Sequence, residues 1–157
     1  MRRYALIVLL VLLFTDAKGT DYWVNASTGS NIPGNGTSSS NPWQTITYAL
    51  SQVSGSGHVI HVAAGTYNTT LGETFPIVIE NGVSLSGADA ATTIVDAGGS
   101  SERVFNCIGI IDASTFIEGL TITGGYVGYE SGYTSAGGAI YVSAGSVLTI
   151  RNNIIDD

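Results

Sequence analysis

Two histidines lie close together in this 157-residue chain, and they are the first residues whose types could support metal or proton chemistry. His58 and His61 could each ligate a metal ion or accept a proton. They are three positions apart, so on a β-strand their side chains would point to opposite faces and could not hold one ion. We therefore predict no metal site here and interpret both as ordinary surface or corner histidines.

The carboxylates are the second candidates, and they are scattered along the chain. Calcium needs several oxygen ligands that converge on one point, and the sequence contains no compact loop of the form D-x-D-x-D. The pair Asp156-Asp157 would face opposite ways on a strand, and we interpret it as a solvated turn. We therefore identify no cofactor, and calcium stays a candidate without a ligand motif. The scattered carboxylates include Asp89, Asp96, Asp112 and Glu118.

The most suggestive stretch is Gly124–Gly138, which reads GGYVGYESGYTSAGG. It contains no lysine, so it is not a phosphate-binding loop. Tyrosine rings on a loop can stack on the faces of sugars, while their hydroxyls form hydrogen bonds. The sequence therefore predicts a carbohydrate-binding site formed by Tyr126, Tyr129, Glu130 and Tyr133. The alternative is that the tyrosines pack on the flank of the fold and the glycines make turns.

The N-terminal segment has the pattern of a secretory signal peptide. Arg2 and Arg3 precede an apolar run at Ala5–Phe14, and small or polar residues follow it. We predict residues 1–19 to be the signal peptide and residues 20–157 to form one secreted or cell-surface domain. The run is shorter than the ~20 apolar residues of a membrane span, so we expect membrane contact only during export. The alternative is a buried N-terminal strand or helix.

The charge of the predicted mature chain excludes some partners. Without residues 1–19 it keeps two basic and eleven acidic residues, a net charge of −9. Binding to nucleic acid or anionic lipid depends on lysine and arginine, so neither partner is expected. Cys107 is the one cysteine, so no intrachain disulfide can form. It lies in an apolar run, and we expect it to be buried.

A pattern of aliphatic, polar and aliphatic residues recurs from residue 60 onward. The copies begin at Ile60, Val83, Leu120 and Leu148. Such a period is typical of a solenoid, and each copy would be one coil of a parallel β-helix with its aliphatic pair facing inward. Glycines at corners such as Asn81-Gly82 and Glu118-Gly119 would let the chain turn. The alternative is a β-sandwich, which hairpin turns would mark.

A short helix at about residues 42–53 is predicted just before the first copy. Asn41 suits the N-cap, Pro42 the first helical position, and Gln44 the third position of a capping box. One face of this helix would be apolar, through Ile46, Ala49, Leu50 and Val53. It would cap the open core of the first coil. We identify no such cap after the last copy, so we expect the natural chain to continue with more coils.

Between Tyr22 and Asp89 the chain contains, in order, YWVNASTGS, NPWQTITYAL, HVIHVAAGTYN and FPIVIENGVSLSGAD. This region resembles an N-terminal domain of unknown function found in pectin-lyase-like right-handed parallel β-helix proteins. The later segments GLTITGG and GGAIYV resemble generic β-helix coils and surface-adhesin repeats. The resemblance implies an all-β, single-stranded, right-handed parallel β-helix located outside the cell. It also implies that sugars lie along the outer face of the stacked strands.

The repeat predicts which residues form that outer face. They would be His61, Ser84, Thr121 and Thr149, flanked by Ala63, Ser86, Thr123 and Arg151. This face would have no carboxylate, whereas glycoside hydrolysis generally needs two, roughly 5–10 Å apart. His61 and Arg151, the candidates for lyase chemistry, would be at least ~14 Å apart at ~4.8 Å per coil. We therefore predict no catalytic residue in this chain.

Two functions follow from the sequence. The first is a non-catalytic module that binds a carbohydrate or a partner, or is structural, with an extracellular polysaccharide or a surface protein as the partner. The alternative is the N-terminal portion of a polysaccharide lyase or glycoside hydrolase whose catalytic coils lie beyond residue 157.

Overall fold

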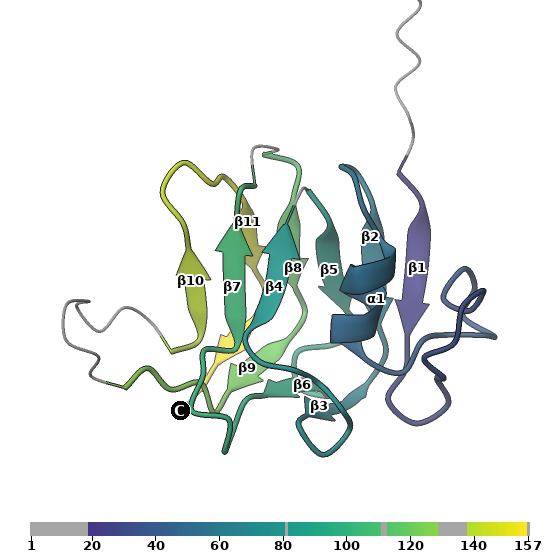
Figure 1. The fold of residues 1–157 in the computed structure, drawn as a ribbon, viewed down its shortest axis with the longest axis horizontal. Helices are drawn as coiled ribbons and strands as arrows, with labels where there is room; N and C mark the ends of the chain where they lie inside the picture. The colour runs from purple at the N-terminus through teal and green to yellow at the C-terminus, as the bar shows by residue number, and fades with distance from the viewer. Residues whose placement is uncertain (1–18, 81, 111–112, 129–137, 157) are drawn as a thin grey trace, which may run out of the picture.

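The computed structural model describes residues 19–80, 82–110, 113–128 and 138–156. Apart from Gly19, the predicted signal peptide lies outside these residues. The described chain folds into short strands and one helix (Figure 1). The elements are β1 (Asp21–Val24), α1 (Ile46–Gln52), β2 (Val59–Val62), β3 (Gly65–Asn68), β4 (Ile77–Glu80), β5 (Ser84–Gly87), β6 (Thr93–Asp96), β7 (Phe105–Ile108), β8 (Phe116–Glu118), β9 (Thr121–Thr123), β10 (Ile140–Val142), β11 (Thr149–Arg151) and β12 (Ile154–Ile155).

The strands form three parallel sheets that the chain visits in turn. The first sheet has the order β1-β2-β5-β8-β11, the second β3-β6-β9-β12, and the third β4-β7-β10. Every strand pairing is parallel. One circuit through the three sheets is one coil, so β2, β3 and β4 make the first complete coil. The predicted parallel β-helix, all-β in class with one short helix, is confirmed.

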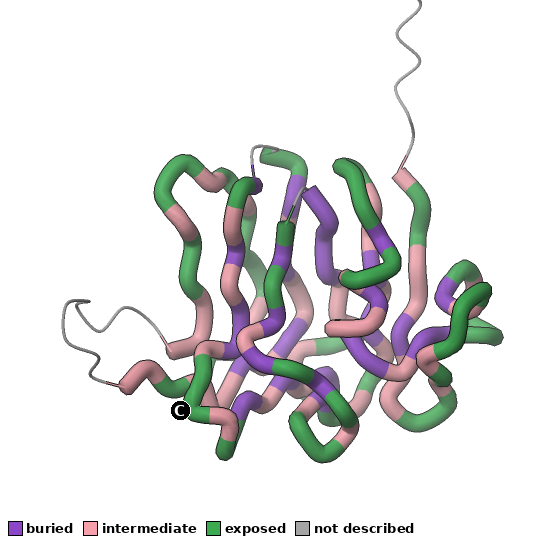
Figure 2. Tube along the Cα trace, viewed as in Figure 1, coloured by how far each residue is buried: buried purple, intermediate pink, exposed green. Residues whose placement is uncertain are grey.

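Stacked aliphatic side chains fill the space between the sheets. Ile60, Leu85 and Ile117 follow one another in register on the first sheet, and each is fully buried. Burying such a side chain contributes about 1.5–3 kcal/mol relative to leaving it exposed. Figure 2 shows the buried segments along the strands that enclose this core. Cys107 on β7 is also fully buried, as predicted, and burial raises the pKa of its thiol to about 12.

The register differs from the alignment of the sequence repeats. Ile60 pairs with Leu85 and not with Val83, and Ile150 takes the place predicted for Leu148. The copy at Leu120 does not belong to the first sheet at all, because Thr121–Thr123 is β9 of the second sheet. An aliphatic-polar-aliphatic pattern marks an inward-facing strand in any sheet, so it cannot say which sheet a strand joins.

Helix α1 begins four residues later than the sequence predicts. The N-cap is Thr45 and not Asn41, and the Thr45 side chain accepts a hydrogen bond from the backbone N–H of Tyr48 at 3.2 Å. The segment before it is held in extended form, because Trp43 donates its N–H to the carbonyl of Trp23 at 2.9 Å. The prediction of a helix over residues 42–53 is therefore wrong about where the helix begins.

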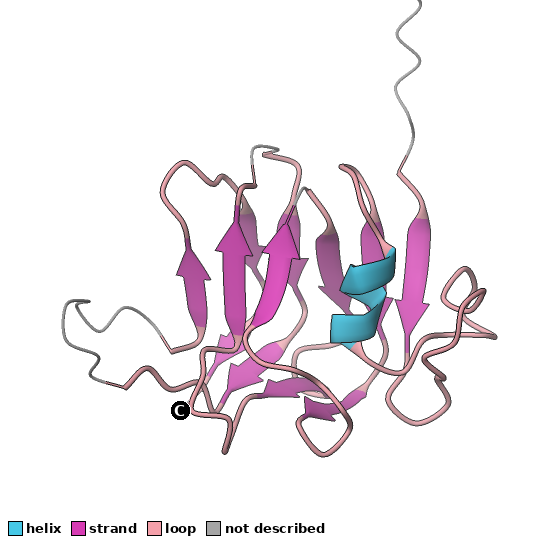
Figure 3. Cartoon of the chain, viewed as in Figure 1, coloured by secondary structure: helices cyan, strands magenta, loops and turns pink. Residues whose placement is uncertain are grey.

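The apolar inner face of α1 is confirmed. Ile46 and Ala49 are fully buried, and Val53, the C-cap residue, is nearly so. The helix contacts β4 and β1, and Figure 3 shows it beside the strands at the β1 end of the stack. It therefore covers the core at the start of the first coil, which is the position predicted for a cap.

A buried carboxylate ties this helix to the first coil. Glu73, in the segment between β3 and β4, is 4% exposed. It accepts hydrogen bonds from the backbone N–H groups of Ile46 at 2.6 Å and Thr47 at 2.8 Å, and from the Thr47 hydroxyl at 2.5 Å. Burial raises the pKa of the Glu73 carboxyl, and these hydrogen bonds partly offset the rise. The first turn of α1 is thus satisfied by a side chain from the coil that it covers.

Candidate functional site

One row of outward-facing side chains runs across all five strands of the first sheet. Strand pairing places its members side by side, one from each strand. Neighbouring strands are ~4.8 Å apart, so the row spans ~19 Å. On β1, β2, β5 and β8 each of these residues is next to a buried core residue, and the register extends the same alternation to β11, so the row lies on the face opposite the core. We call this set the outer row, and it comprises Trp23, His61, Ser86, Glu118 and Arg151.

The start of the outer row is an aromatic pair. The rings of Trp23 and His61 stack, with centroids 5.5 Å apart and planes at 26°. The Nε2 atom of His61 also lies 3.2 Å from the Oδ1 atom of Asp21. The two polar side chains are 41% and 59% exposed, and such pairs contribute at most ~1 kcal/mol to stability. The contact with Asp21 therefore orients the imidazole more than it stabilises the fold.

The far end of the outer row is a hydrogen-bonded chain of polar groups. The Ser86 hydroxyl donates to Oε1 of Glu118 at 3.2 Å, and Nε of Arg151 donates to Oε2 at 2.7 Å. The guanidinium of Arg151 also lies 5.0 Å from the ring centroid of Phe116. Arg151 and Glu118 keep 53% and 24% of their side chains exposed. The prediction that this face has no carboxylate is therefore wrong.

The sequence missed Glu118 because the repeat alignment put Thr121 in its place. The register moves Thr121 and Thr123 to the second sheet, and Ala63 follows the end of β2. Thr149 lies in the adjacent row of the first sheet and is exposed. Ser84, which was predicted for the outer face, is 3% exposed, and its hydroxyl oxygen accepts a hydrogen bond from the backbone N–H of Phe116. The sequence carries no clear signal for the true row, because Phe116-Ile117-Glu118 begins with two apolar residues and shows no polar–apolar alternation.

The carboxylates on this face are too far apart to act as a glycosidase pair. Asp21 on β1 and Glu118 on β8 are separated by three strand spacings, or ~14 Å along the sheet. Hydrolysis generally needs roughly 5–10 Å. His61 and Arg151 are also three strands apart, as predicted. The described residues of this face therefore offer ring stacking and hydrogen bonds, and they place no carboxylate pair at catalytic spacing.

A pocket of about 340 Å³ lies at the start of the outer row. Trp23, His61 and Ser86 line it from the first sheet. Ser39 and Pro42 line it from the segment between β1 and α1. The pocket is therefore bounded by the sheet and by the loop that leads to the cap helix.

The predicted tyrosine site can be placed only in part. Tyr126 follows β9 and is 61% exposed, and its backbone N–H donates to the carbonyl of Glu102 at 2.8 Å. It lines a separate pocket of about 320 Å³ with Arg103. Tyr129, Glu130 and Tyr133 lie outside the described residues, so the site that they would form with Tyr126 is not tested. The carbohydrate site at this loop stays a prediction.

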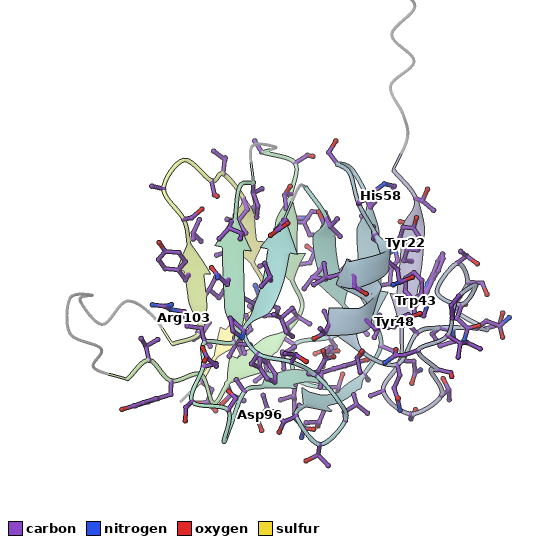
Figure 4. The ribbon with its side chains drawn as sticks, in the orientation of Figure 1. Tyr22, Trp43, Tyr48, His58, Asp96 and Arg103 are labelled. Carbon is purple, nitrogen blue, oxygen red and sulfur yellow. The ribbon has the colours of Figure 1, made fainter. Side chains whose placement is uncertain are left out.

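The two histidines have different neighbours. Figure 4 shows His58 beside Tyr22 at the cap end of the molecule. The Tyr22 ring in turn stacks on Trp43, and the Trp43 ring meets Tyr48 edge to face. The rings of Tyr22 and His58 meet edge to face at 5.7 Å, and Nδ1 of His58 accepts a hydrogen bond from the backbone of Thr20. His61 instead contacts Trp23 and Asp21. The pair therefore forms no common site.

The acidic residues that can be placed act locally. The Asp89 and Asp96 carboxylates accept backbone hydrogen bonds from Ala91 and Gly98, each at 2.7 Å. Asp112 lies outside the described residues. Among the residues that the structure describes, no group of three or more histidine, cysteine or acidic side chains comes together.

The sheets, the cap helix and the outer row together define a capped parallel β-helix protein. The family model described as "Protein of unknown function (DUF1565)" matches residues 27–157, and the chain belongs to this family. No curated protein and no solved structure matches the chain. In the described part of the chain, no helix has the length and apolar character needed to cross a membrane.

Proposed function

We propose that this chain is a secreted or cell-surface module that binds polysaccharide along the outer row without cleaving it. The observation that carries the proposal is the register, which aligns an aromatic pair and a chain of polar groups on one rigid sheet. The resemblance to pectin-lyase-like proteins supports the same face, because sugars lie along the outer strands in that superfamily.

The outer row offers the two kinds of contact that sugars use. The Trp23 ring at its start presents an apolar surface and an indole N–H. Ser86, Glu118 and Arg151 then supply a hydroxyl, a carboxylate and guanidinium donors. Because these groups belong to neighbouring parallel strands, their spacing is fixed by the backbone before any ligand arrives. Such preorganisation lowers the entropy that binding costs.

The charge of the chain favours a neutral polysaccharide over an acidic one. The predicted mature chain has a net charge of −9. On the outer face, the carboxylate of Glu118 already pairs with Arg151 at 2.7 Å. Asp21 adds a second negative charge beside His61. A polymer rich in uronate or sulfate would therefore meet repulsion, whereas neutral sugar hydroxyls can bind both the acceptors and the donors.

A second candidate is the N-terminal portion of a polysaccharide lyase or glycoside hydrolase. The Glu118–Arg151 pair favours it, because lyase chemistry needs a base together with a group that holds the sugar carboxylate. Under this hypothesis the chain would be completed by coils beyond residue 157. A lyase would release unsaturated sugars from an acidic polysaccharide, and their ultraviolet absorbance is the measurement that separates the two candidates.

The direct test is a glycan array probed with the purified full chain. We expect binding to neutral polysaccharides, and we expect Trp23→Ala to lower the affinity at least about tenfold, a loss of about 1.4 kcal/mol. Tyr141→Ala is the matched control, because Tyr141 is an aromatic residue of the third sheet that is 36% exposed. Circular dichroism melting curves verify that both variants fold. No binding by the folded wild-type chain, or equal losses in both variants, would contradict the proposal.

A further inference from the structure

We propose that the outer row binds the end of a polysaccharide chain and not its interior. This inference rests on the proposed function and specifies which part of the polymer the site recognises. It depends on one difference between the two ends of the row, which lies in the loop between β1 and α1.

The cap segment occupies the edge of the sheet at the start of the outer row. The backbone N–H of Trp23 donates to the carbonyl of Gly36 at 2.8 Å, and the N–H of Trp43 donates to the carbonyl of Trp23 at 2.9 Å. Trp43 also forms a parallel bridge with Val24. The backbone edge of β1 that faces away from β2 is thus hydrogen-bonded to Gly36 and Trp43, the two ends of the segment that contains Ser39 and Pro42.

The same segment forms a wall of the pocket. Ser39 and Pro42 line it together with Trp23 and His61, although they come from the loop and not from the sheet. Its volume of about 340 Å³ falls at the lower end of the range of about 300–1,000 Å³ that small-molecule pockets occupy. The pocket therefore suits a short ligand segment, such as a terminal sugar, bounded by the loop.

The path away from the pocket follows the remaining members of the row. Ser86 lines the pocket and donates to Glu118, which in turn accepts from Arg151. A polymer with its last sugar in the pocket can therefore extend over Glu118 and Arg151 and leave the wall behind it. A polymer bound through its interior would have to cross Ser39 and Pro42 to continue past Trp23.

The terminal sugar also differs chemically from the interior ones. It has one more free hydroxyl, at the position where an interior sugar is linked to its neighbour. Ser39 supplies a hydroxyl at the wall, which can pair with such a group as donor or acceptor. The wall therefore leaves no room for a further sugar linked to the one in the pocket. Its Ser39 hydroxyl can form a hydrogen bond with the free hydroxyl that a chain end has in place of that link.

The experiment compares equal masses of one bound neutral polysaccharide before and after limited cleavage. If cleavage gives ten times as many ends per mass, the apparent Kd in mass units should fall about tenfold, since binding follows the concentration of ends. An unchanged Kd would overturn chain-end recognition while leaving polysaccharide binding intact. No binding to either sample would overturn both proposals.

A pocket-filling variant tests the wall itself. Ser39→Trp places a large ring in the pocket. We expect this variant to lose the tenfold fall in apparent Kd that cleavage of the polysaccharide produces in the wild-type chain. Ser51→Trp on α1 is the matched control, because both serines are exposed, and it should keep this fall in apparent Kd. If Ser39→Trp retains the full fall while it folds, the pocket does not hold the chain end and the inference fails. Misfolding of Ser39→Trp leaves the cleavage comparison on the wild-type chain as the decisive result.

Discussion

Side chains at equivalent positions are buried at the cap end and largely exposed on the last coil. Ile60, on the first complete coil, is fully buried, with β1 and the cap on one side and β5 on the other. Ile150 continues the same inward-facing column of the first sheet, but it is 42% exposed. Ile155 likewise follows the buried Ile122 on the second sheet and is 60% exposed. An inward position therefore buries a side chain only where layers lie on both sides of it.

The first prediction has the largest expected effect, and it compares the stability loss at two neighbouring positions of this inward-facing column. Ile117 and Ile150 are the same residue type on adjacent strands in register, and they differ in burial. Ile117→Ala should lower the free energy of unfolding by about 2–5 kcal/mol, because it leaves a cavity. Ile150→Ala should cost less than about 1 kcal/mol, as at partly exposed positions. Denaturant titration measures both, and equal losses would contradict the comparison.

The second prediction concerns the carboxylate that ties the cap helix to the first coil. In Glu73→Gln, the amide NH₂ cannot accept from the backbone N–H groups of Ile46 and Thr47, so one buried donor loses its partner. We expect a loss of about 1–3 kcal/mol in the free energy of unfolding. Glu80→Gln on the exposed position of β4 is the control and should change it by less than about 0.5 kcal/mol. Similar values for the two variants would show that Glu73 does not tie the cap.

Burial of Glu73 also predicts how the stability of the chain changes with pH. Burial raises the pKa of the Glu73 carboxyl above its ordinary value of 4.5. A raised pKa in the folded state adds stability below the ordinary pKa, and this contribution is lost as the pH rises through the folded-state pKa. The difference in unfolding free energy between wild type and Glu73→Gln should therefore narrow as the pH rises from about 4.5. A difference that widens over this range would mean that the hydrogen bonds outweigh burial.

The third prediction has the smallest expected effect on stability, and it tests where the cap helix begins. Thr45→Ala removes the oxygen that accepts from the N–H of Tyr48, and it should cost about 1 kcal/mol. Asn41→Ala changes the residue that the sequence indicates as the cap, and it should cost less than about 0.5 kcal/mol. Thermal unfolding of the two variants compares them. A larger loss at Asn41 would restore the sequence-based helix start.

Much of the architecture could be predicted because it depends on local patterns. The alternation around Ile60 and the apolar spacing of Ile46 and Ala49 mark inward faces wherever these segments pack. Burial of Cys107 follows from its apolar neighbours in the same way. The parallel β-helix and its cap were therefore accessible from the sequence.

The start of the helix could not be predicted, because it depends on contacts made far away in the sequence. Pro42 and Gln44 have good helix-start chemistry, but Asn31 accepts the backbone N–H groups of Gln44 and Thr45 through its side chain. Trp43 is meanwhile hydrogen-bonded to β1. These long-range hydrogen bonds keep the segment extended, and no local signal reports them.

The outer row was missed for a related reason. Loops of different lengths separate the strands of the first sheet, so the repeat spacing does not identify which strands pair. The match of Leu120 to Ile60 was good in pattern, but the positive φ of 70° at Gly119 turns the chain and sends the following residues to the second sheet. Only the pairing of Ser86 with Glu118 reveals the carboxylate on the outer face.

The most direct test of the account is a cysteine cross-link that reports the register of the outer row. Ser86 and Glu118 are paired neighbours on adjacent strands, within the range of about 4.4–6.8 Å between Cα atoms that a disulfide spans. We predict that Ser86→Cys with Glu118→Cys forms a disulfide under mild oxidation, and that Ser84→Cys with Thr121→Cys does not. Cys107 is fully buried and so gives little background. A disulfide in the second pair and none in the first would contradict the register on which the outer row depends.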